Sequence, residues 1–188
     1  MNLQSTLITD VKVLKRDVRQ DERGSFTRLF GKDELALLGH EASAIHVNSS
    51  TSTQAGTLRG IHFQYPPHAE EKIVSCVRGA VWDLAVDLRP NSPTRFQWHG
   101  ELLTPENGTS LIVPKGCGHA FITLEDDSTV VYAISNAYAP EFESGIAFDD
   151  PLLSIEWPMS PTTLSSKDQS WSPLQDRINE LTERFSSL

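Results

Sequence analysis

Four polar side chains suited to binding or proton transfer lie close together early in the sequence. They are Arg59, His62, Gln64 and Lys72. An imidazole can accept a proton near neutral pH, whereas a guanidinium and an ammonium can hold negative charge. Apolar residues alternate with polar ones through this stretch, as in strands that cover a core. We therefore expect several polar groups to point inward together, an arrangement typical of a functional site.

Length and composition predict one domain over residues 1–188, with a core of about residues 10–158 and a C-terminal arm and helix over 159–188. The net charge of −9 argues against a nucleic-acid partner but is compatible with an anionic small molecule held by a local group of cations. No apolar run is long enough to span a membrane, and the first residues lack the features of a signal peptide. We therefore expect a cytoplasmic location and no membrane partner.

Many short alternating stretches, separated by turn residues about every 8–12 positions, predict an all-β fold with an antiparallel barrel or sandwich. A short helix is expected over residues 32–38, ended by Gly39, after a turn at residues 21–25. Strands are expected over residues 7–15, 26–30, 42–52, 57–64, 72–77, 80–88, 95–103, 110–113, 119–123 and 129–135.

The last part of the chain has a different pattern. Residues 154–173, rich in serine and proline, predict an ordered arm on the barrel surface. Ser172 followed by Pro173 predicts the cap and first position of a final helix. One apolar stripe follows the helical period, and it consists of Leu174, Ile178, Leu181 and Phe185. The stripe can dock either on the barrel or on a partner chain, and the sequence leaves both open.

A second group of residues extends from Pro114 to His119. Its pattern, Pro-x-Gly-x-x-His, resembles a motif of the cupin superfamily, small barrels that bind a ligand in their mouth. Metal-binding cupins add a His-x-His pair and a carboxylate, but this chain has His62-Phe63-Gln64 and lacks the second imidazole. Two histidines with a distant Glu70 or Glu71 make a poor transition-metal site. We therefore predict no metal, and a metal-dependent cupin remains an alternative.

A longer series of motifs resembles the dTDP-4-dehydrorhamnose 3,5-epimerase family, metal-free cupins that act on nucleotide-linked 4-keto-6-deoxy sugars. The resemblance extends over about residues 10–174. It is carried by Arg59-Gly60-Ile61-His62, Lys72, Asp83, Asp87, Pro114 to Phe121, Tyr132, Tyr138-Ala139-Pro140, Glu143-Ser144-Gly145, Asp149-Asp150-Pro151, Ile155-Glu156-Trp157-Pro158 and Leu164-Ser165-Ser166-Lys167-Asp168.

Epimerisation beside a ketone needs a base, a group that holds enolate charge, and an acid on the opposite face. The resemblance implies that His62 is the base, oriented by Asp168. It implies that Lys72 lies near the ketone oxygen and that Tyr132 is the acid. No cofactor is implied. The implied substrate-binding residues are Arg23, Phe26, Arg28, His46, Asn48, Arg59, Gln64, His119, Tyr138, Glu143 and Lys167. The family also implies a homodimer, in which an exchanged N-terminal strand brings Arg23 and Arg28 to the neighbour's pocket.

Four positions depart from the family pattern. Arg28 replaces a glutamate, His46 and Glu70 replace glutamines, and Ala133 replaces a lysine. The proposed catalytic residues are unaffected, but a guanidinium cannot replace a carboxylate that accepts a nucleobase N–H. We therefore expect retained epimerase chemistry with an altered nucleotide or sugar, such as a CDP- or GDP-linked ketosugar. The alternatives are an epimerase restricted to one carbon, a ketoisomerase on the same scaffold, and a catalytically silent sugar-nucleotide binder.

Overall fold

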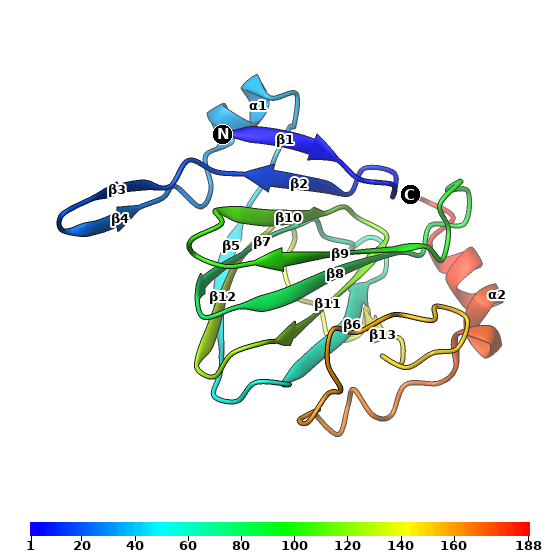
Figure 1. Ribbon diagram of the computed structural model, residues 1–188. Coiled ribbons are helices and arrows are strands. Elements are labelled where there is room, and N and C mark those ends of the chain that lie inside the picture. Colours follow the sequence, from blue (N-terminus) through cyan, green and yellow to red (C-terminus); the bar gives the residue numbers. More distant parts are fainter.

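The computed structural model describes all 188 residues. It contains thirteen strands and two helices, joined by turns and loops (Figure 1). Two antiparallel sheets contain eleven of the thirteen strands. The six-stranded sheet has the order β1 (Asn2–Ser5), β2 (Lys12–Lys15), β10 (Thr109–Val113), β7 (Lys72–Arg78), β12 (Ser128–Ile134) and β5 (His46–Ser52). The five-stranded sheet has the order β13 (Glu143–Gly145), β6 (Leu58–Gln64), β11 (Cys117–Thr123), β8 (Val81–Asp87) and β9 (Trp98–Leu103).

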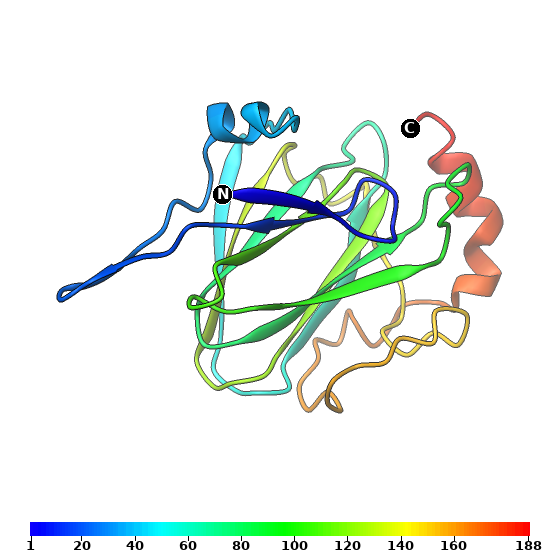
Figure 2. The same ribbon diagram turned by 45° about the horizontal axis from the view of Figure 1, so that its top comes forward.

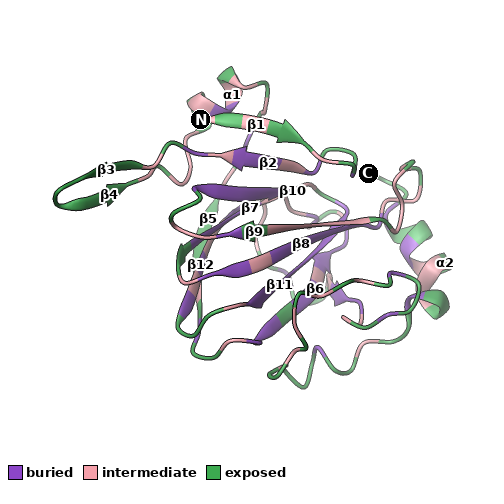
Figure 3. Ribbon diagram, in the orientation of Figure 1, coloured by how far each residue is buried: buried purple, intermediate pink, exposed green.

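Apolar side chains from both sheets meet between them. Val74 and Val130 of the six-stranded sheet pack with Val81, Leu103 and Phe121 of the five-stranded sheet. The central strands are largely buried, while the edge strands β1 and β5 and much of the loops are exposed (Figure 3). The predicted all-β class with antiparallel strands is confirmed.

The prediction of one strand over residues 7–15 was wrong, because the chain reverses direction between β1 and β2. The Thr6 hydroxyl accepts the Ile8 N–H and also donates to the Val11 carbonyl, which stabilises a turn. Asp10 adopts a left-handed backbone with φ of 64°. The missed strand β1 is largely exposed, so it shows no apolar alternation. Val11 is buried between the sheets, as its pattern indicated.

The hairpin of β3 (Arg19–Asp21) and β4 (Gly24–Phe26) extends away from the two sheets (Figures 1 and 2). The predicted turn is present, but the returning strand ends at Phe26 and does not continue to residue 30. Every residue of both strands is exposed. Nothing in this chain therefore packs against the hairpin to lengthen it.

Helix α1 (Lys32–Leu37) covers the outer face of the six-stranded sheet. Its buried Leu35 packs against Leu14, Ile73 and Ile112. The helix ends as predicted before Gly39, which has φ of 76°, a conformation that glycine adopts without strain.

Helix α2 (Leu174–Arg184) lies against the outer face of the five-stranded sheet, so the apolar stripe docks on this chain itself. Leu181 and Phe185 are fully buried there, and the Phe185 ring lies 5.5 Å from that of Phe63 and 5.1 Å from that of Tyr65. Neither helix is long and apolar enough to cross a membrane.

The predicted helix cap at Ser172 was wrong. Pro173 occupies the N-cap position, and no side chain at that position caps the helix. The carboxylate of Asp150 instead accepts the Leu174 N–H at 2.7 Å and the Leu152 N–H at 3.0 Å. A distant residue thus satisfies an amide at the start of the helix, where a local serine was expected to act as the cap.

Candidate active site

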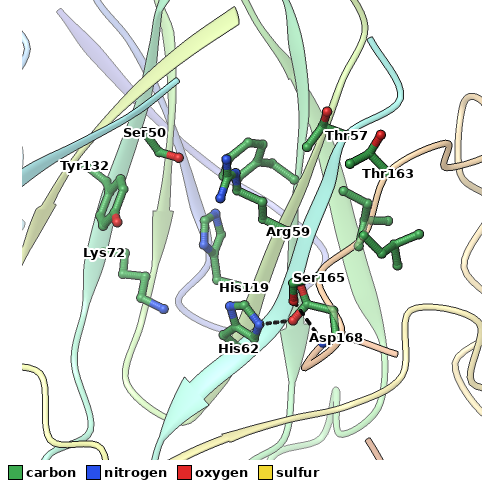
Figure 4. Close-up of a pocket in the computed structure, with 13 residues that line it drawn as sticks. Ser50, Thr57, Arg59, His62, Lys72, His119, Tyr132, Thr163, Ser165 and Asp168 are labelled. Carbon is green, nitrogen blue, oxygen red and sulfur yellow. Dashed lines mark hydrogen bonds and ion pairs between the residues drawn. The ribbon is translucent and has the colours of Figure 1, made fainter. Parts of the chain in front are cut away.

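A cavity of about 470 Å³ opens between the two sheets and is closed on one side by the C-terminal arm (Figure 4). Its walls come from β5, β6, β7, β11 and β12, together with residues 163–168. Six residues predicted from the sequence line it: Arg59, His62, Lys72, His119, Tyr132 and Asp168.

An irregularity in β6 explains how both Arg59 and His62 reach the cavity, although strand alternation would put them on opposite faces. His62 is opposite His119, and Arg59 is opposite Phe121, so three steps on β6 match two on β11. Such a bulge changes the direction of the side chains that follow it. Gly60 lies within this irregularity with φ of 125°, and an added Cβ would lie 2.4 Å from the Ala120 Cβ. Only glycine fits there.

His62 and Asp168 form a close pair, with His62 Nε2 2.5 Å from Asp168 Oδ1. The Asp168 side chain is only 4% exposed, and its backbone N–H donates to the Ser165 hydroxyl. Burial raises the pKa of Asp168, but hydrogen bonds to His62 and to neighbouring groups lower it more, so the net pKa lies below its usual value. An ionised carboxylate only accepts hydrogen bonds, so His62 Nε2 carries the hydrogen and Nδ1 keeps a lone pair.

A second histidine–carboxylate pair lies on the neighbouring strands. His119 Nε2 is 2.8 Å from Asp83 Oδ1, and both side chains are buried. Burial raises the pKa of Asp83, while the nearby His119 opposes that rise. Asp83 thus orients the second imidazole of the cavity from behind.

Lys72 and Tyr132 face the cavity from the six-stranded sheet, across from His62 and Asp168 (Figure 4). The Lys72 ammonium is 3.1 Å from the Glu70 carboxylate. Burial raises the pKa of Tyr132, and the charge of Arg59 partly offsets that rise. The Tyr132 phenol therefore stays protonated near neutral pH.

A smaller cavity of about 250 Å³ shares His62, Lys72 and Tyr132 with the first. Four more of the predicted residues line it: Asn48, Gln64, Tyr138 and Glu143.

Glu143 connects the smaller cavity to the C-terminal arm. Its Oε2 accepts from the Tyr138 hydroxyl and from the Lys167 ammonium, each at 2.5 Å. Burial raises the pKa of Glu143, but Lys167 and Tyr138 lower it more, which keeps the carboxylate ionised. The predicted residue Lys167 therefore lines neither cavity but pairs with Glu143, which lines the smaller one.

The remaining predicted residues line neither cavity. Arg23 and Phe26 lie on the projecting hairpin, where the Arg23 side chain is 82% exposed and Phe26 is 62% exposed. Arg28 follows that hairpin and pairs with Glu34 of α1 at 2.9 Å. His46 is exposed at the start of the edge strand β5.

Several lining residues were not predicted from the sequence. Ser50 lies two positions after Asn48 on β5, so strand alternation could have placed it beside that residue. Ser165 precedes Asp168 by three positions, a spacing typical of a side chain that caps a backbone amide. Phe121 lies two positions after His119 on β11, so the same alternation could have placed it. No local signal marks the remaining ones, which are Thr57, Leu58, Thr163 and Leu164.

No group of three or more His, Cys, Asp or Glu side chains is arranged to hold a metal ion. Each cavity histidine already has one ring nitrogen on a carboxylate. The donors present suit proton transfer and the binding of negative charge.

The family model of dTDP-4-dehydrorhamnose 3,5-epimerase matches residues 5–176. The chain belongs to this family. The Escherichia coli K12 epimerase of that name is 39% identical over 180 residues, which are 95% of this chain and 97% of the relative. The match agrees closely with the extent of the resemblance seen in the motifs.

Solved structures of the family have the same fold. The Legionella pneumophila dTDP-6-deoxy-D-glucose-3,5-epimerase, in complex with dTDP-4-keto-L-rhamnose, has a TM-score of 0.90 at 37% identity, covering 96% of each chain. A 3'-monoepimerase from Streptomyces bikiniensis, in complex with dTDP-quinovose, has a TM-score of 0.89 at 32% identity, covering 98% of this chain and 95% of the other. The predicted family and fold are confirmed, and the protein is a nucleotide-sugar epimerase of the isomerase class.

Proposed function

We propose that this epimerase inverts carbons adjacent to the ketone of a nucleotide-diphosphate 4-keto-6-deoxy sugar, using His62, Asp168, Lys72 and Tyr132. The supporting observation is that His62, already paired with Asp168, and Tyr132 line one cavity from opposite sheets. A base on one side of a bound ring and an acid on the other are what inversion requires.

Each proton and electron pair in the reaction can be assigned to these groups. Nδ1 of His62 takes the proton from the carbon, and the electron pair of that C–H bond moves into the new C=C bond as the ketone becomes an enolate. The Lys72 ammonium stabilises the enolate oxygen. The Tyr132 hydroxyl then gives its proton to the opposite face of the carbon, and solvent restores both groups. Asp168 keeps Nε2 protonated throughout, so that Nδ1 remains the acceptor.

Exchange of substrate hydrogen for solvent deuterium tests this function. Wild-type protein in D₂O should incorporate deuterium at C3, at C5 or at both in a nucleotide 4-ketosugar, and inversion should accompany the exchange. A protein that binds the sugar nucleotide without exchange would be a silent binder. Exchange confined to C3 would indicate a monoepimerase, as in the Streptomyces relative. Elemental analysis of the same preparation tests the proposed metal independence.

The nucleotide is a separate question, because the cited solved relatives hold dTDP sugars and this chain has Arg28 in place of a glutamate. We propose that this charge reversal changes the preferred base. Calorimetric titration with dTDP, UDP, CDP and GDP should show tighter binding of a nucleotide other than dTDP. A clear preference for dTDP would refute the altered specificity and leave the epimerase proposal intact.

We also propose a homodimer in which the projecting hairpin completes the partner's site. The support is that Arg23 and Phe26 are strongly exposed and line neither cavity of their own chain. Mixing His62→Asn protein with Arg23→Ala protein should restore activity, because one of the two mixed sites then has both residues intact. Failure to restore activity in mixed dimers, or a monomer by light scattering, would contradict the proposal.

A further inference from the structure

The Lys72 ammonium has a buried ionic partner within its own strand region. Glu70 lies two residues before Lys72, and its Oε1 is 3.1 Å from Lys72 Nζ. The side chains are only 7% and 13% exposed, for Glu70 and Lys72 respectively. Solvent therefore screens this pair much less than it screens an ordinary surface salt bridge.

The carboxylate of Glu70 is itself fixed by a buried amide. Gln64 Nε2 donates to Glu70 Oε2 at 2.7 Å, and it also faces the His68 and Ala137 carbonyls at 3.0 and 3.1 Å. Gln64 Oε1 accepts the Ala139 N–H at 2.6 Å. The Gln64 amide is thus anchored to two loops, and Glu70 is anchored to Gln64.

We propose that Glu70 is a positioning residue, which holds the Lys72 ammonium at the wall shared by the two cavities so that its other donors meet the enolate oxygen. This inference rests on the proposed function. It assigns no substrate contact to Glu70.

The physical basis is the flexibility of lysine. A four-carbon stem leaves the ammonium free to move unless something holds it, and electrostatic stabilisation depends on a donor that is already in place. One of the three ammonium hydrogens goes to Glu70, which leaves the other two for the cavity. The pair also makes this part of the wall electrically neutral. Loss of the Glu70 carboxylate without another acceptor in its place should therefore impair turnover without weakening the binding of an anionic nucleotide.

Glu70→Ala is the test variant, because it removes the group that accepts from the Lys72 ammonium, and Glu71→Ala is its matched control. Glu71 is the next residue, undergoes the same chemical change, and pairs with His40 instead of Lys72. Glu70→Ala should lower kcat about tenfold, the scale of a small misplacement of a reacting group, with KM within twofold of wild type. Glu71→Ala should leave both within twofold. An unchanged kcat in Glu70→Ala, or an equal loss in Glu71→Ala, would overturn the proposal.

A Lys72→Met background shows whether Glu70 acts through the lysine. Adding Glu70→Ala there should cause no further loss of solvent exchange, because the group that Glu70 positions is absent. A further tenfold loss would show an independent, structural effect and would overturn the proposal.

A spectroscopic measurement separates this inference from the proposed function. In ¹⁵N-lysine-labelled protein, an ammonium signal that disappears in Lys72→Met belongs to Lys72. We expect that signal in wild type and in Glu71→Ala, and we expect its loss through exchange with water in Glu70→Ala. Retention of the signal in Glu70→Ala, or its absence from wild type, would overturn the inference. A wild type that shows the signal but no sugar exchange would refute only the proposed function.

Discussion

Replacing Asp168 by asparagine removes one charge from the His62 pair while keeping the side-chain shape. In wild type, the carboxylate accepts from His62 Nε2 at 2.5 Å, which leaves Nδ1 as the base. An amide can instead present its NH₂ group to Nε2, and Nδ1 then carries the hydrogen and cannot accept a proton. The variant should therefore bind substrate and fail in the chemical step.

The size of this loss can be worked from the geometry of the pair. Once Nδ1 has taken the substrate proton, His62 is positively charged, and opposite charges about 4 Å apart attract by about 4 kcal/mol at an effective dielectric constant of about 20. His62 is 31% exposed, and partial screening reduces the contribution to about 3 kcal/mol. At 1.36 kcal/mol for each factor of ten, kcat should fall at least about a hundredfold.

The assay is the initial rate of deuterium incorporation from D₂O, with KM measured alongside kcat. Asp149→Asn is the matched control, because Asp149 is exposed and lines neither cavity. We expect the control to behave as wild type and Asp168→Asn to retain its KM. A fall in kcat of less than threefold in Asp168→Asn would refute the role of the pair.

Three further predictions concern packing and pH. Gly145→Ala would place a Cβ 2.3 Å from the Trp171 indole, and it should lower the free energy of unfolding in urea by about 1–3 kcal/mol; an unchanged denaturation midpoint would contradict this packing. Burial raises the pKa of Asp87, but hydrogen bonds from Arg89 and neighbouring hydroxyls lower it more, so its stabilisation should be present above about pH 4 and lost as the pH falls through the lower folded pKa. Asp87→Asn should therefore cost about 3 kcal/mol at pH 7 and less in acid, and a pH-independent cost would contradict this. Because burial raises the pKa of Tyr132, loss of its proton should lower kcat of the wild type only above about pH 10. A fall in kcat below about pH 9 that is absent from Tyr132→Phe would contradict this.

Much of the fold could be predicted because local patterns survive in the folded chain. The apolar stretch of β8 is almost entirely buried, and so are Leu174, Leu181 and Phe185 of the α2 stripe. Strand β1 has no such pattern because its side chains are exposed, and β13 has only three residues. The cap of α2 was missed because Asp150 supplies it from 24 positions away. Interactions between distant residues leave no local periodicity.

The candidate site, like the fold, could be predicted only in part. His62 and Asp168 are 106 positions apart, so only the resemblance to a family could pair them. Strand alternation alone would have separated Arg59 from His62, and the bulge at Gly60 brings both into the cavity. The pairing of Glu70 with Lys72 was not predicted from the sequence, although Glu70 was noted there as a departure from the family pattern. Chemistry could thus be assigned by residue type, whereas orientation required the structure.

The central claim is that a base and an acid work on opposite faces of one sugar ring. The most direct measurement compares deuterium incorporation with inversion in Tyr132→Phe protein incubated with a nucleotide 4-ketosugar in D₂O. His62 would still remove the proton and return deuterium to the same face, so we predict exchange without a change of configuration. Normal inversion in this variant, or undiminished inversion after His62→Asn, would contradict the account.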